Sequence, residues 1–323
     1  MAARPLRFGV LGATSLVSRL AVAPAMKSST TCTLVATASL SDPAATYSSY
    51  EALLADREVE AVYIPLPNSM HREWTERAAA AGKHVLCEKP LAASAADAAA
   101  MAAACDAAGV VLMEAYMTQF HPRDRRWRGL VASGAVGEPL FARAAFTGVL
   151  DRPDDHRWRP EMGGGSLLDV GIYCLTPLLV ALGGGAQDAG AVRRASGAAR
   201  WTEQGVDASF AGWLEFGGGR AGSFECSFEA PERQQLEIVG TDGALSIDRA
   251  YTPGTADTLI SLRHREGSVE TLEAGGADPY RLMVEHFAAA VRGSEQLERP
   301  VRDSVELAKI VDRLGAAARL PAA

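Results

Sequence analysis

The chain has 323 residues, with 48% apolar and 22% charged residues, which is the composition of a globular protein large enough for two domains. Its net charge of −7, without a run of basic residues, argues against nucleic acid or an anionic membrane as a partner. The five cysteines form no Cys-x-x-Cys pair, which argues against a disulfide framework or a zinc site and favours reduced thiols in the cytoplasm. We find neither a signal-peptide layout nor a stretch apolar enough to span a bilayer, and we predict no bound metal.

The first 119 residues alternate between predicted strands and helices. Strands are predicted over 6–11, 33–39, 61–65, 84–87 and 110–114. Ser49 and Ser94 are predicted to cap two of the intervening helices, and Pro24 to bend or end the first one. Strand–helix alternation with short loops predicts a parallel, doubly wound α/β sheet, a Rossmann domain over residues 1–119.

Residues 120–323 predict a second domain of a different kind. A short helix over 124–132, a strand over 140–148 and a helix over 167–182 come first. The stretch 191–272 then alternates between apolar and polar residues, most clearly over 208–216, 222–229, 234–240, 244–248 and 259–263. This alternation, with Gly and Asp at the breaks, predicts a mostly antiparallel open sheet, and helices over 279–291 and 303–318 complete an α+β domain.

The loop after the first strand is a candidate phosphate site. A strand, a glycine turn and a helix N-terminus direct backbone N–H groups at an anion. The dinucleotide fingerprint Gly-x-Gly-x-x-Gly keeps only its first glycine, with Thr14 and Val17 at the other two positions. The candidate contacts are Gly12, Ala13, Thr14, Ser15 and Leu16. An ordinary strand–helix turn is the alternative.

The end of the second strand normally selects between NAD and NADP. An acid there binds the ribose 2′-OH of NAD, and an Arg nearby accepts the 2′-phosphate of NADP. Here the chain reads Ala38-Ser39-Leu40-Ser41-Asp42 and shows neither signal. Ser39 is the candidate contact, since its hydroxyl can bond either group.

Two further loops fall where ligands bind in open parallel sheets, beyond the carboxyl ends of strands. Glu88-Lys89-Pro90 follows the fourth strand, and Pro90 restricts the chain that carries Lys89. The loop after the third strand supplies the candidates Leu66, Pro67, Asn68 and His71. The alternatives are a surface Glu-Lys pair, capping of the next helix by Asn68 or Ser69, and an exposed His71.

A distal stretch, 156–173, carries three consecutive glycines and several polar residues. Asp169 and Tyr173 are four residues apart, so on an α-helix they share one face. A Tyr, an Asp and the ammonium of Lys89 could together move one proton. A structural interface helix is the alternative interpretation.

Taken together, these motifs resemble the glucose–fructose oxidoreductase / inositol dehydrogenase / MocA family. Pro-x-Pro-Asn-x-x-His, Glu-Lys-Pro and Gly-Gly-Gly-x-Leu-Leu-Asp-x-Gly-x-Tyr carry the resemblance, which covers nearly the whole chain. The last motif ends in Tyr, and in this it resembles one branch of the family. That branch holds sugar 3-ketoreductases, xylose dehydrogenases and dihydrodiol dehydrogenases. The resemblance implies that Lys89 binds the substrate oxygen, Tyr173 exchanges the proton and Asp169 orients the sugar. It also implies that Glu88 and Pro90 position Lys89, and that Asn68, His71, Arg157 and Trp158 lie at the cofactor.

The implied activity is hydride transfer between NAD(P)(H) and a secondary alcohol or ketone of a sugar, nucleotide-sugar or cyclic polyol. The branch favours NADP(H), although Leu40 stands where its usual Arg would be, and the stretch from Ser39 to Ser49 is too short for the helix usual there. Two alternatives stay open: a binding or regulatory protein with weak cofactor affinity, and a glycosidase that uses NAD internally.

The predicted antiparallel sheet also suggests an assembly. Its strands carry the aromatic residues Phe210, Trp213, Phe224 and Phe228, which cannot all point to one covered face if the strands alternate. An exposed apolar sheet face is typically an interaction surface. We therefore expect a homodimer or homotetramer through this sheet, with a solvated polar face as the alternative.

Overall fold

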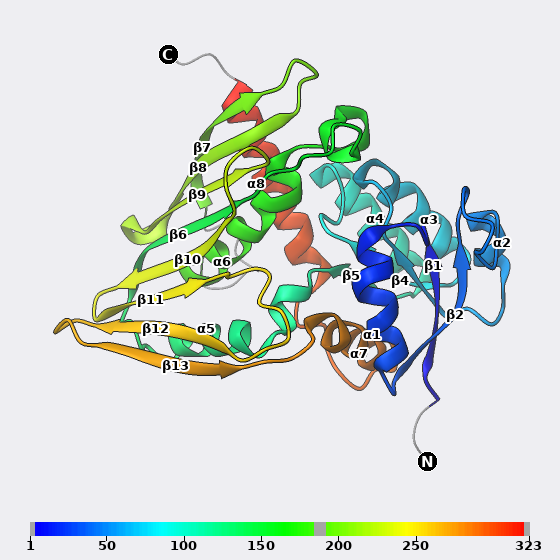
Figure 1. The fold of residues 1–323 in the computed structure, drawn as a ribbon, viewed down its shortest axis with the longest axis horizontal. Helices are drawn as coiled ribbons and strands as arrows, with labels where there is room; N and C mark the ends of the chain where they lie inside the picture. Colours follow the sequence, from blue (N-terminus) through cyan, green and yellow to red (C-terminus); the bar gives the residue numbers. More distant parts are fainter. Residues whose placement is uncertain (1–3, 184–191, 320–323) are drawn as a thin grey trace. The chain divides into compact units, whose positions relative to one another are not determined.

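The computed structural model describes residues 4–183 and 192–319 (Figure 1). The chain separates into two compact units. Unit 1 comprises residues 1–117 and 278–305, and unit 2 comprises residues 118–277 and 306–323. The first crossing, at residue 117, falls close to the predicted boundary at 119, whereas the return of residues 278–305 to unit 1 has no counterpart in the sequence-based division.

Unit 1 is built on a five-stranded parallel sheet, as predicted. Its strands have the order β2-β1-β3-β4-β5, and their bounds are β1 Leu6–Leu11, β2 Cys32–Ala38, β3 Ala61–Ile64, β4 His84–Glu88 and β5 Leu112–Ala115. All four residues of β3 and of β5 are buried, because a parallel sheet has both faces covered by helices. The Rossmann class of this unit is thereby confirmed.

The helices of unit 1 lie on both faces of this sheet (Figure 1). They are α1 Ala23–Ser28, α2 Tyr50–Ala55, α3 His71–Ala80, α4 Ala95–Ala108 and α7 Pro279–Val291, with a 3₁₀ turn η2 Asn68–Met70 before α3. Ser49 and Ser94 cap α2 and α4 through their side chains, as predicted. Pro24 does not end the first helix, because it occupies the first turn of α1, after a π-helical turn η1 Ser18–Val22.

Residues 278–305 join unit 1 through apolar packing. The ring of Phe287, on α7, lies 5.6 Å from the ring of Phe8 on β1. Both side chains are fully buried, and the Cys32 thiol donates to the carbonyl of Val284 at 3.2 Å. The last part of the sequence therefore completes a core that the first strand begins. A short helix, η3 Met117–Phe120, follows β5 at the crossing into unit 2.

Unit 2 contains an eight-stranded sheet with the order β13-β12-β11-β10-β6-β9-β8-β7. Its strands are β6 Pro139–Thr147, β7 Val192–Trp201, β8 Asp207–Phe216, β9 Ala221–Ser227, β10 Arg233–Gly240, β11 Gly243–Asp248, β12 Thr258–His264 and β13 Val269–Gly275. Among the described strands of this sheet, β6 and β9 are the one pair that runs in parallel, so the mostly antiparallel prediction is confirmed. Strands β7 and β13 were not among the predicted segments, and residue 191, where the alternation was predicted to begin, lies outside the described residues.

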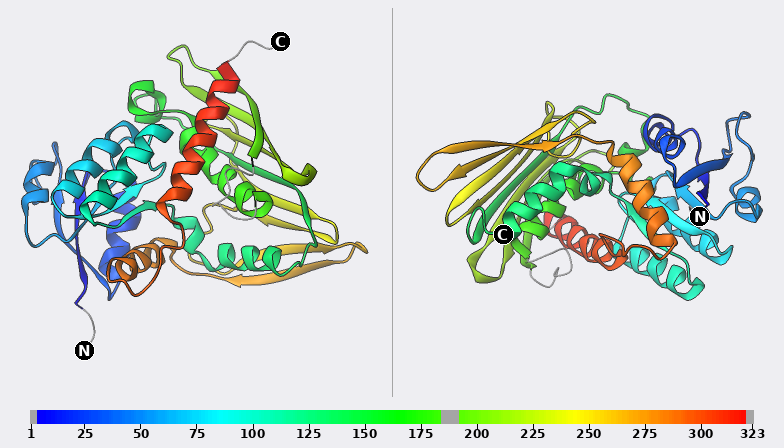
Figure 2. Two further views of the ribbon diagram at one scale, coloured as in Figure 1. Left: turned by 180° about the vertical axis from the view of Figure 1, so that it is seen from behind. Right: turned by 90° about the horizontal axis from the view of Figure 1, so that it is seen from below.

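The helices of unit 2 cover one face of this sheet (Figure 2). The longer ones are α5 Pro122–Ala132, α6 Ile172–Gly183 and α8 Val301–Arg319, whose last residues belong to this unit. Shorter turns are η4 His156–Trp158, η5 Pro160–Met162, the π-helical η6 Leu167–Gly171 and η8 Gly217–Gly219. Gly222 on β9 shows the closeness of this packing, since an added Cβ would lie 3.2 Å from Leu178 on α6.

One helical stretch of unit 2, residues 160–183, is long and apolar enough to cross a membrane by length and composition. The sequence-based expectation that no stretch is apolar enough to span a bilayer does not hold for this stretch by that criterion. In the structure 72% of its most apolar window is buried, and the stretch is divided among 3₁₀, π and α segments. It therefore has the properties of a core helix that covers a sheet.

The outer face of the eight-stranded sheet is less aromatic than the sequence suggested. Phe210, Phe224 and Phe228 are buried, and the rings of Phe210 and Phe224 stack 5.8 Å apart on the helix-covered face. Of the four aromatic residues considered, Trp213 is the exposed one, at 46%, and Phe141 on β6 is exposed at 50%. The outer face is thus mixed in character.

Candidate active site

The glycine turn after β1 is the predicted cradle for a dinucleotide. Gly12 has a φ of +93°, and a Cβ added there would lie 2.8 Å from the Cδ2 atom of Leu66. Both requirements favour glycine. The N–H groups of Gly12 and Ala13 donate to Ala38 O at 3.0 Å, which closes the turn against β2. Thr14 and Leu16 are exposed at the start of the next helix, whose N-terminal N–H groups suit a phosphate.

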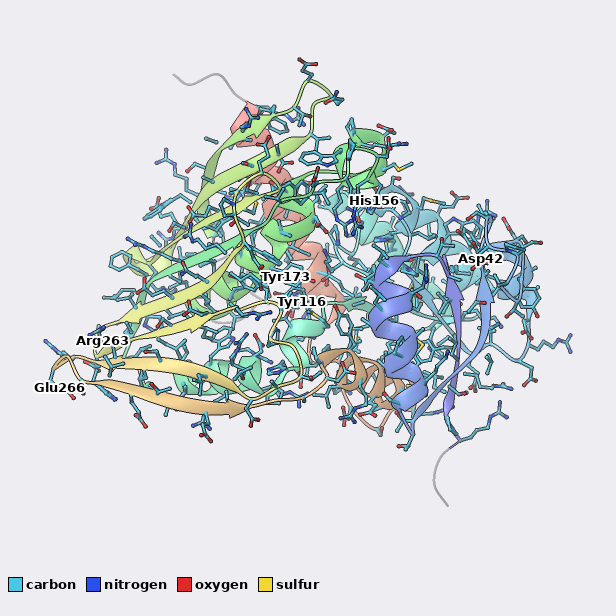
Figure 3. All side chains as sticks on the ribbon, in the orientation of Figure 1. Asp42, Tyr116, His156, Tyr173, Arg263 and Glu266 are labelled. Atoms are coloured by element: carbon cyan, nitrogen blue, oxygen red, sulfur yellow. The ribbon has the colours of Figure 1, made fainter. Side chains whose placement is uncertain are left out.

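The side chain of Ser39, which follows β2, is hydrogen-bonded within the turn that it begins. Its hydroxyl oxygen accepts the N–H groups of Ser41 at 3.2 Å and Asp42 at 3.0 Å, and the residue is buried. Its hydroxyl proton is the group left for a ligand. Asp42, labelled in Figure 3, is partly exposed and accepts the N–H of Ala44 at 2.9 Å. Residues 39–49 contain no helix, in agreement with the short stretch noted in the sequence.

Lys89 follows directly on β4, and the carboxylate of Glu88 fixes the backbone from which it extends. Glu88 accepts the hydroxyl of Tyr63 at 2.6 Å and the backbone N–H of Lys89 at 3.2 Å. Burial and the carboxylate of Glu88 raise the pKa of Tyr63 well above its usual value, so its phenol remains a donor. Lys89 itself is half-buried, at the carboxyl end of a parallel strand where the fold class binds ligands.

His71 is buried in the structure. It is the first residue of α3, whose N-cap is Met70, so neither Asn68 nor Ser69 occupies the cap position. The ring reaches two loops at the edge of the sheet, with Nδ1 3.0 Å from the carbonyl oxygen of Pro90 and Nε2 2.8 Å from that of Leu66. Leu66, Pro67 and Asn68 are partly exposed on this edge.

A second buried carboxylate supports the same loop, and sequence reasoning missed it. Glu114, on β5, accepts the backbone N–H of Leu91 at 2.9 Å and the hydroxyl of Ser304 at 2.6 Å. The guanidinium of Arg299 lies 3.2 Å from the same carboxylate, and both side chains are at most 5% exposed. A buried acid is stable only with such partners. Sequence gave no sign of them, because Arg299 and Ser304 are remote in the chain.

Unit 2 places Asp169 in an ion pair. The Nε of Arg157 donates to Asp169 at 2.8 Å, and its Nη1 donates to Asp155 at 3.1 Å. The two carboxylates raise the pKa of Arg157 against the opposing effect of burial. Arg157, predicted as a cofactor contact, thus has a defined partner in Asp169, and Trp158 packs edge-on against Phe228 at 5.3 Å.

The triple glycine lets the chain fold back on this ion pair. The N–H of Gly165 donates to Arg157 O, and that of Gly164 to Arg159 O, each at 3.0 Å. A Cβ at Gly164 would overlap the backbone of Arg157. Asp169 then lies in the π-helical turn η6, so the four-residue spacing to Tyr173 is not a simple α-helical pair. Single π turns inside helices are frequent at functional sites.

Tyr173 lies in the first turn of α6 and is labelled in Figure 3. Its ring is held by Phe146 at 5.4 Å in an edge-on contact and by Tyr251 at 5.9 Å. Tyr251 is fixed in turn, because its hydroxyl donates to Gln235 O at 3.0 Å. The side chain is only 8% exposed, so its phenol has a restricted set of positions.

The structure therefore brings the predicted residues together in two groups. In unit 1 the glycine turn, the loop of residues 65–68 and Lys89 share the carboxyl edge of one parallel sheet. In unit 2 Arg157, Asp169 and Tyr173 share one turn-and-helix segment. These features together favour a nicotinamide-dependent oxidoreductase: a parallel sheet with a glycine turn, a lysine at a strand end, and a second unit with an acid and a tyrosine.

Comparison with known proteins is consistent with this class. Residues 7–116 match the oxidoreductase family with an NAD-binding Rossmann fold, and residues 125–246 match the GFO/IDH/MocA C-terminal domain. The chain belongs to the Gfo/Idh/MocA family and is an NAD(P)-dependent oxidoreductase. The resemblance found in the sequence is thus confirmed.

Several relatives are similar over most of their length. A D-xylose 1-dehydrogenase (NADP(+)) of Haloferax volcanii is 39% identical over 278 residues, which is 86% of this chain and 83% of that protein. A dTDP-3,4-didehydro-2,6-dideoxy-alpha-D-glucose 3-reductase of Streptomyces violaceoruber is 36% identical, covering 91% of this chain and 87% of that protein. The crystal structure of a 3-ketoreductase from Actinomadura kijaniata, in complex with NADP and TDP-benzene, matches with a TM-score of 0.90 at 28% identity, covering 98% of both chains.

Replacement of Gly12 by Ala tests the glycine cradle. We expect Gly12→Ala to lower the affinity for NADPH by about tenfold or more, because the backbone must move away from Leu66, with a loss of stability of about 1–2 kcal/mol from the positive φ. Gly134→Ala is the control, since Gly134 has a φ of +80° but open space around its Cβ. Fluorescence titration should show unchanged NADPH binding in that control, and equal effects of the two variants would refute a cradle at Gly12.

Proposed function

We propose that this protein transfers a hydride between NADP(H) and a secondary alcohol or ketone on a sugar, a nucleotide-sugar or a cyclic polyol. Relatives named as a xylose dehydrogenase and as a dTDP-sugar 3-reductase support the sugar class. The observation that carries the proposal is the fixed backbone of Lys89 at the carboxyl end of β4, where buried Glu88 accepts its N–H.

In this proposal Lys89 binds the oxygen of the reacting carbon. In the direction of reduction that oxygen becomes negative as its carbon receives a hydride, and a positioned ammonium stabilises the developing charge. Because Glu88 is bonded to Tyr63 and to the Lys89 backbone, it holds the strand end without requiring contact with the substrate.

Tyr173 supplies the proton to the same oxygen, and Asp169 orients the sugar through its hydroxyl groups. The proton passes from the phenol to the substrate oxygen, and solvent then reprotonates the phenolate. Support comes from the packing of the Tyr173 ring against Phe146 and from the ion pair between Arg157 and Asp169, which holds that carboxylate in one orientation. Positioned acid–base groups of this kind contribute about 10²–10⁴-fold to rate.

A bound nicotinamide dinucleotide would supply or accept the hydride. The residues present fit such a group. Gly12 leaves the turn after β1 without a side chain, and the helix that follows the turn begins there with its N-terminus. We infer NADP(H) from the NADP-dependent relatives. The exposed side chain of Leu40 and the hydroxyl proton of Ser39 would lie at the adenosine end.

Two substitutions test these roles. Lys89→Ala and Tyr173→Phe should each lower kcat by about 10²–10⁴-fold, with NADPH affinity changed little, because each removes a group that acts on the substrate oxygen. Steady-state rates with D-xylose and with dTDP-sugars provide the measurement. Lys27→Ala, on α1, and Tyr47→Phe, whose hydroxyl donates to Asp56, are the matched controls. Near-wild-type turnover in Lys89→Ala would end this mechanism.

We also propose that the protein forms a homodimer, or a homotetramer, through the outer face of the eight-stranded sheet. This face contains a groove of about 660 Å³, lined in part by Arg143, Ala145, Ala211 and Glu237. Small residues permit a close approach of two sheets, while charges of both signs can pair across a two-fold axis. The exposed aromatic residues Phe141 and Trp213 lie on the same face.

The assembly has a direct test in the molecular mass. Light scattering should give at least twice the chain mass of 34.0 kDa, and Arg143→Glu should reduce it to 34.0 kDa, because reversal of one charge places like charges together. Leu20→Glu, at an exposed position of unit 1, is the control and should leave the mass unchanged. A mass of 34.0 kDa for the wild-type protein would contradict the proposal.

A cytoplasmic location is part of the proposal. All five cysteines are free and buried. Such thiols suit a reducing compartment, where disulfides do not persist.

A further inference from the structure

His71 joins two loops that carry different parts of the proposed site. Its side chain is fully buried, with Nε2 2.8 Å from the carbonyl oxygen of Leu66 and Nδ1 3.0 Å from the carbonyl oxygen of Pro90. Leu66 belongs to the loop of residues 65–68 after β3, which we call the cofactor loop. Pro90 belongs to residues 88–91 after β4, which we call the lysine loop. One imidazole therefore spans the gap between two strand ends.

Both partners of the ring are carbonyl oxygens, so the ring must act as a hydrogen-bond donor. An imidazolium donates to both carbonyls, and a neutral imidazole donates to one of them. Burial lowers the pKa of His71, whereas the carbonyls of Leu66, Pro90 and Leu91 and the carboxylate of Glu114 oppose that effect. With an acceptor at each nitrogen, the ring joins both loops by hydrogen bonds as the imidazolium, whereas the neutral ring holds one loop by a hydrogen bond and the other by packing alone.

Each loop has a second contact that conveys its position to the site. The side chain of Leu66 packs against Gly12, where an added Cβ would lie only 2.8 Å from the Leu66 Cδ2 atom. The cofactor loop is therefore in contact with the glycine turn. On the other side Glu114 accepts the N–H of Leu91 at 2.9 Å, next to Pro90. A displacement of either loop would thus move the dinucleotide cradle or the backbone of Lys89.

We propose that His71 is a positioning residue that ties the cofactor loop to the lysine loop, so that the ordering of one loop by a bound cofactor also places Lys89. The inference rests on the proposed function and deepens it. His71 acts through Leu66 and Pro90. Without the tie, cofactor affinity and turnover become separable properties of the protein.

Two conservative substitutions cut the tie at one end each. The amide nitrogen of Asn occupies the position of histidine Nδ1, and that of Gln occupies the position of Nε2. His71→Asn therefore keeps a donor for Pro90 and releases Leu66, while His71→Gln keeps a donor for Leu66 and releases Pro90. His71→Phe keeps a ring of similar size without any donor.

We expect opposite effects from the two variants. His71→Asn should weaken NADPH binding about five- to tenfold, the size of one lost hydrogen bond, with kcat at saturating cofactor changed by less than about threefold. His71→Gln should lower kcat about tenfold, with the Kd for NADPH within about twofold of wild type. His71→Phe should show both losses.

Hydrogen exchange provides a readout that does not depend on turnover. His71→Asn should accelerate exchange in peptides covering residues 63–70 alone, and His71→Gln in peptides covering residues 86–93 alone. His286→Asn is the matched control, because His286 is also buried in unit 1 but bonds to Glu295 and to the N–H of Glu298. It should change neither peptide.

The outcomes separate this inference from the proposed function. The wild-type protein could lack sugar oxidoreductase activity while the two variants still show the selective changes in exchange and in NADPH binding. That result would uphold the tie and refute the function. An active wild type whose two variants lose affinity and kcat in equal measure would refute the tie. Wild-type behaviour of both variants would also overturn it and reduce His71 to a volume-filling residue. Should His71→Phe fail to fold, the Asn and Gln variants carry the test.

Discussion

The buried carboxylates at the ends of β4 and β5 determine where Lys89 lies. Burial of an ionised acid is costly unless donors surround it. Glu88 accepts hydrogen bonds from the Tyr63 hydroxyl and the Lys89 N–H. Glu114 pairs with Arg299 and accepts hydrogen bonds from the Ser304 hydroxyl and the Leu91 N–H. Since the two backbone N–H groups flank Pro90, the carboxylates hold the lysine loop from both sides. The flexible ammonium thereby extends from a rigid support, which a reaction at a defined atom requires.

The sequence predicted the fold well where local patterns decide the structure. Apolar strands, Ser49 and Ser94 caps and short loops identified the parallel sheet of unit 1. Strand β7 was not singled out within the alternating stretch 191–272, because it is rich in Ala and Arg and Val192 is its one β-branched residue. Its register comes from pairing with β8. The return of residues 278–305 to unit 1 depends on the Phe8–Phe287 contact, which no local pattern encodes.

The site was predicted as a set of residues rather than as a set of interactions. Gly12, Lys89, Asp169 and Tyr173 were predicted because each lies in a motif or at a strand end. Their supporting partners, such as Tyr63 for Glu88 and Arg157 for Asp169, depend on distances that only the folded chain defines. His71 illustrates the difference, since its motif indicated a cofactor contact or an exposed residue, and the structure places its ring between two backbone carbonyls.

The central claim is net hydride transfer between a sugar carbon and a nicotinamide, and isotope transfer tests it most directly. The protein would be incubated with NADP⁺ and sugars that carry deuterium on the reacting carbinol carbon, beginning with D-xylose labelled at C1. The account predicts that each oxidised sugar leaves one deuterium in an accumulating pool of NADPH. Cleavage of a glycoside without net change of the cofactor, or tight cofactor binding with every sugar returned unchanged, would contradict it.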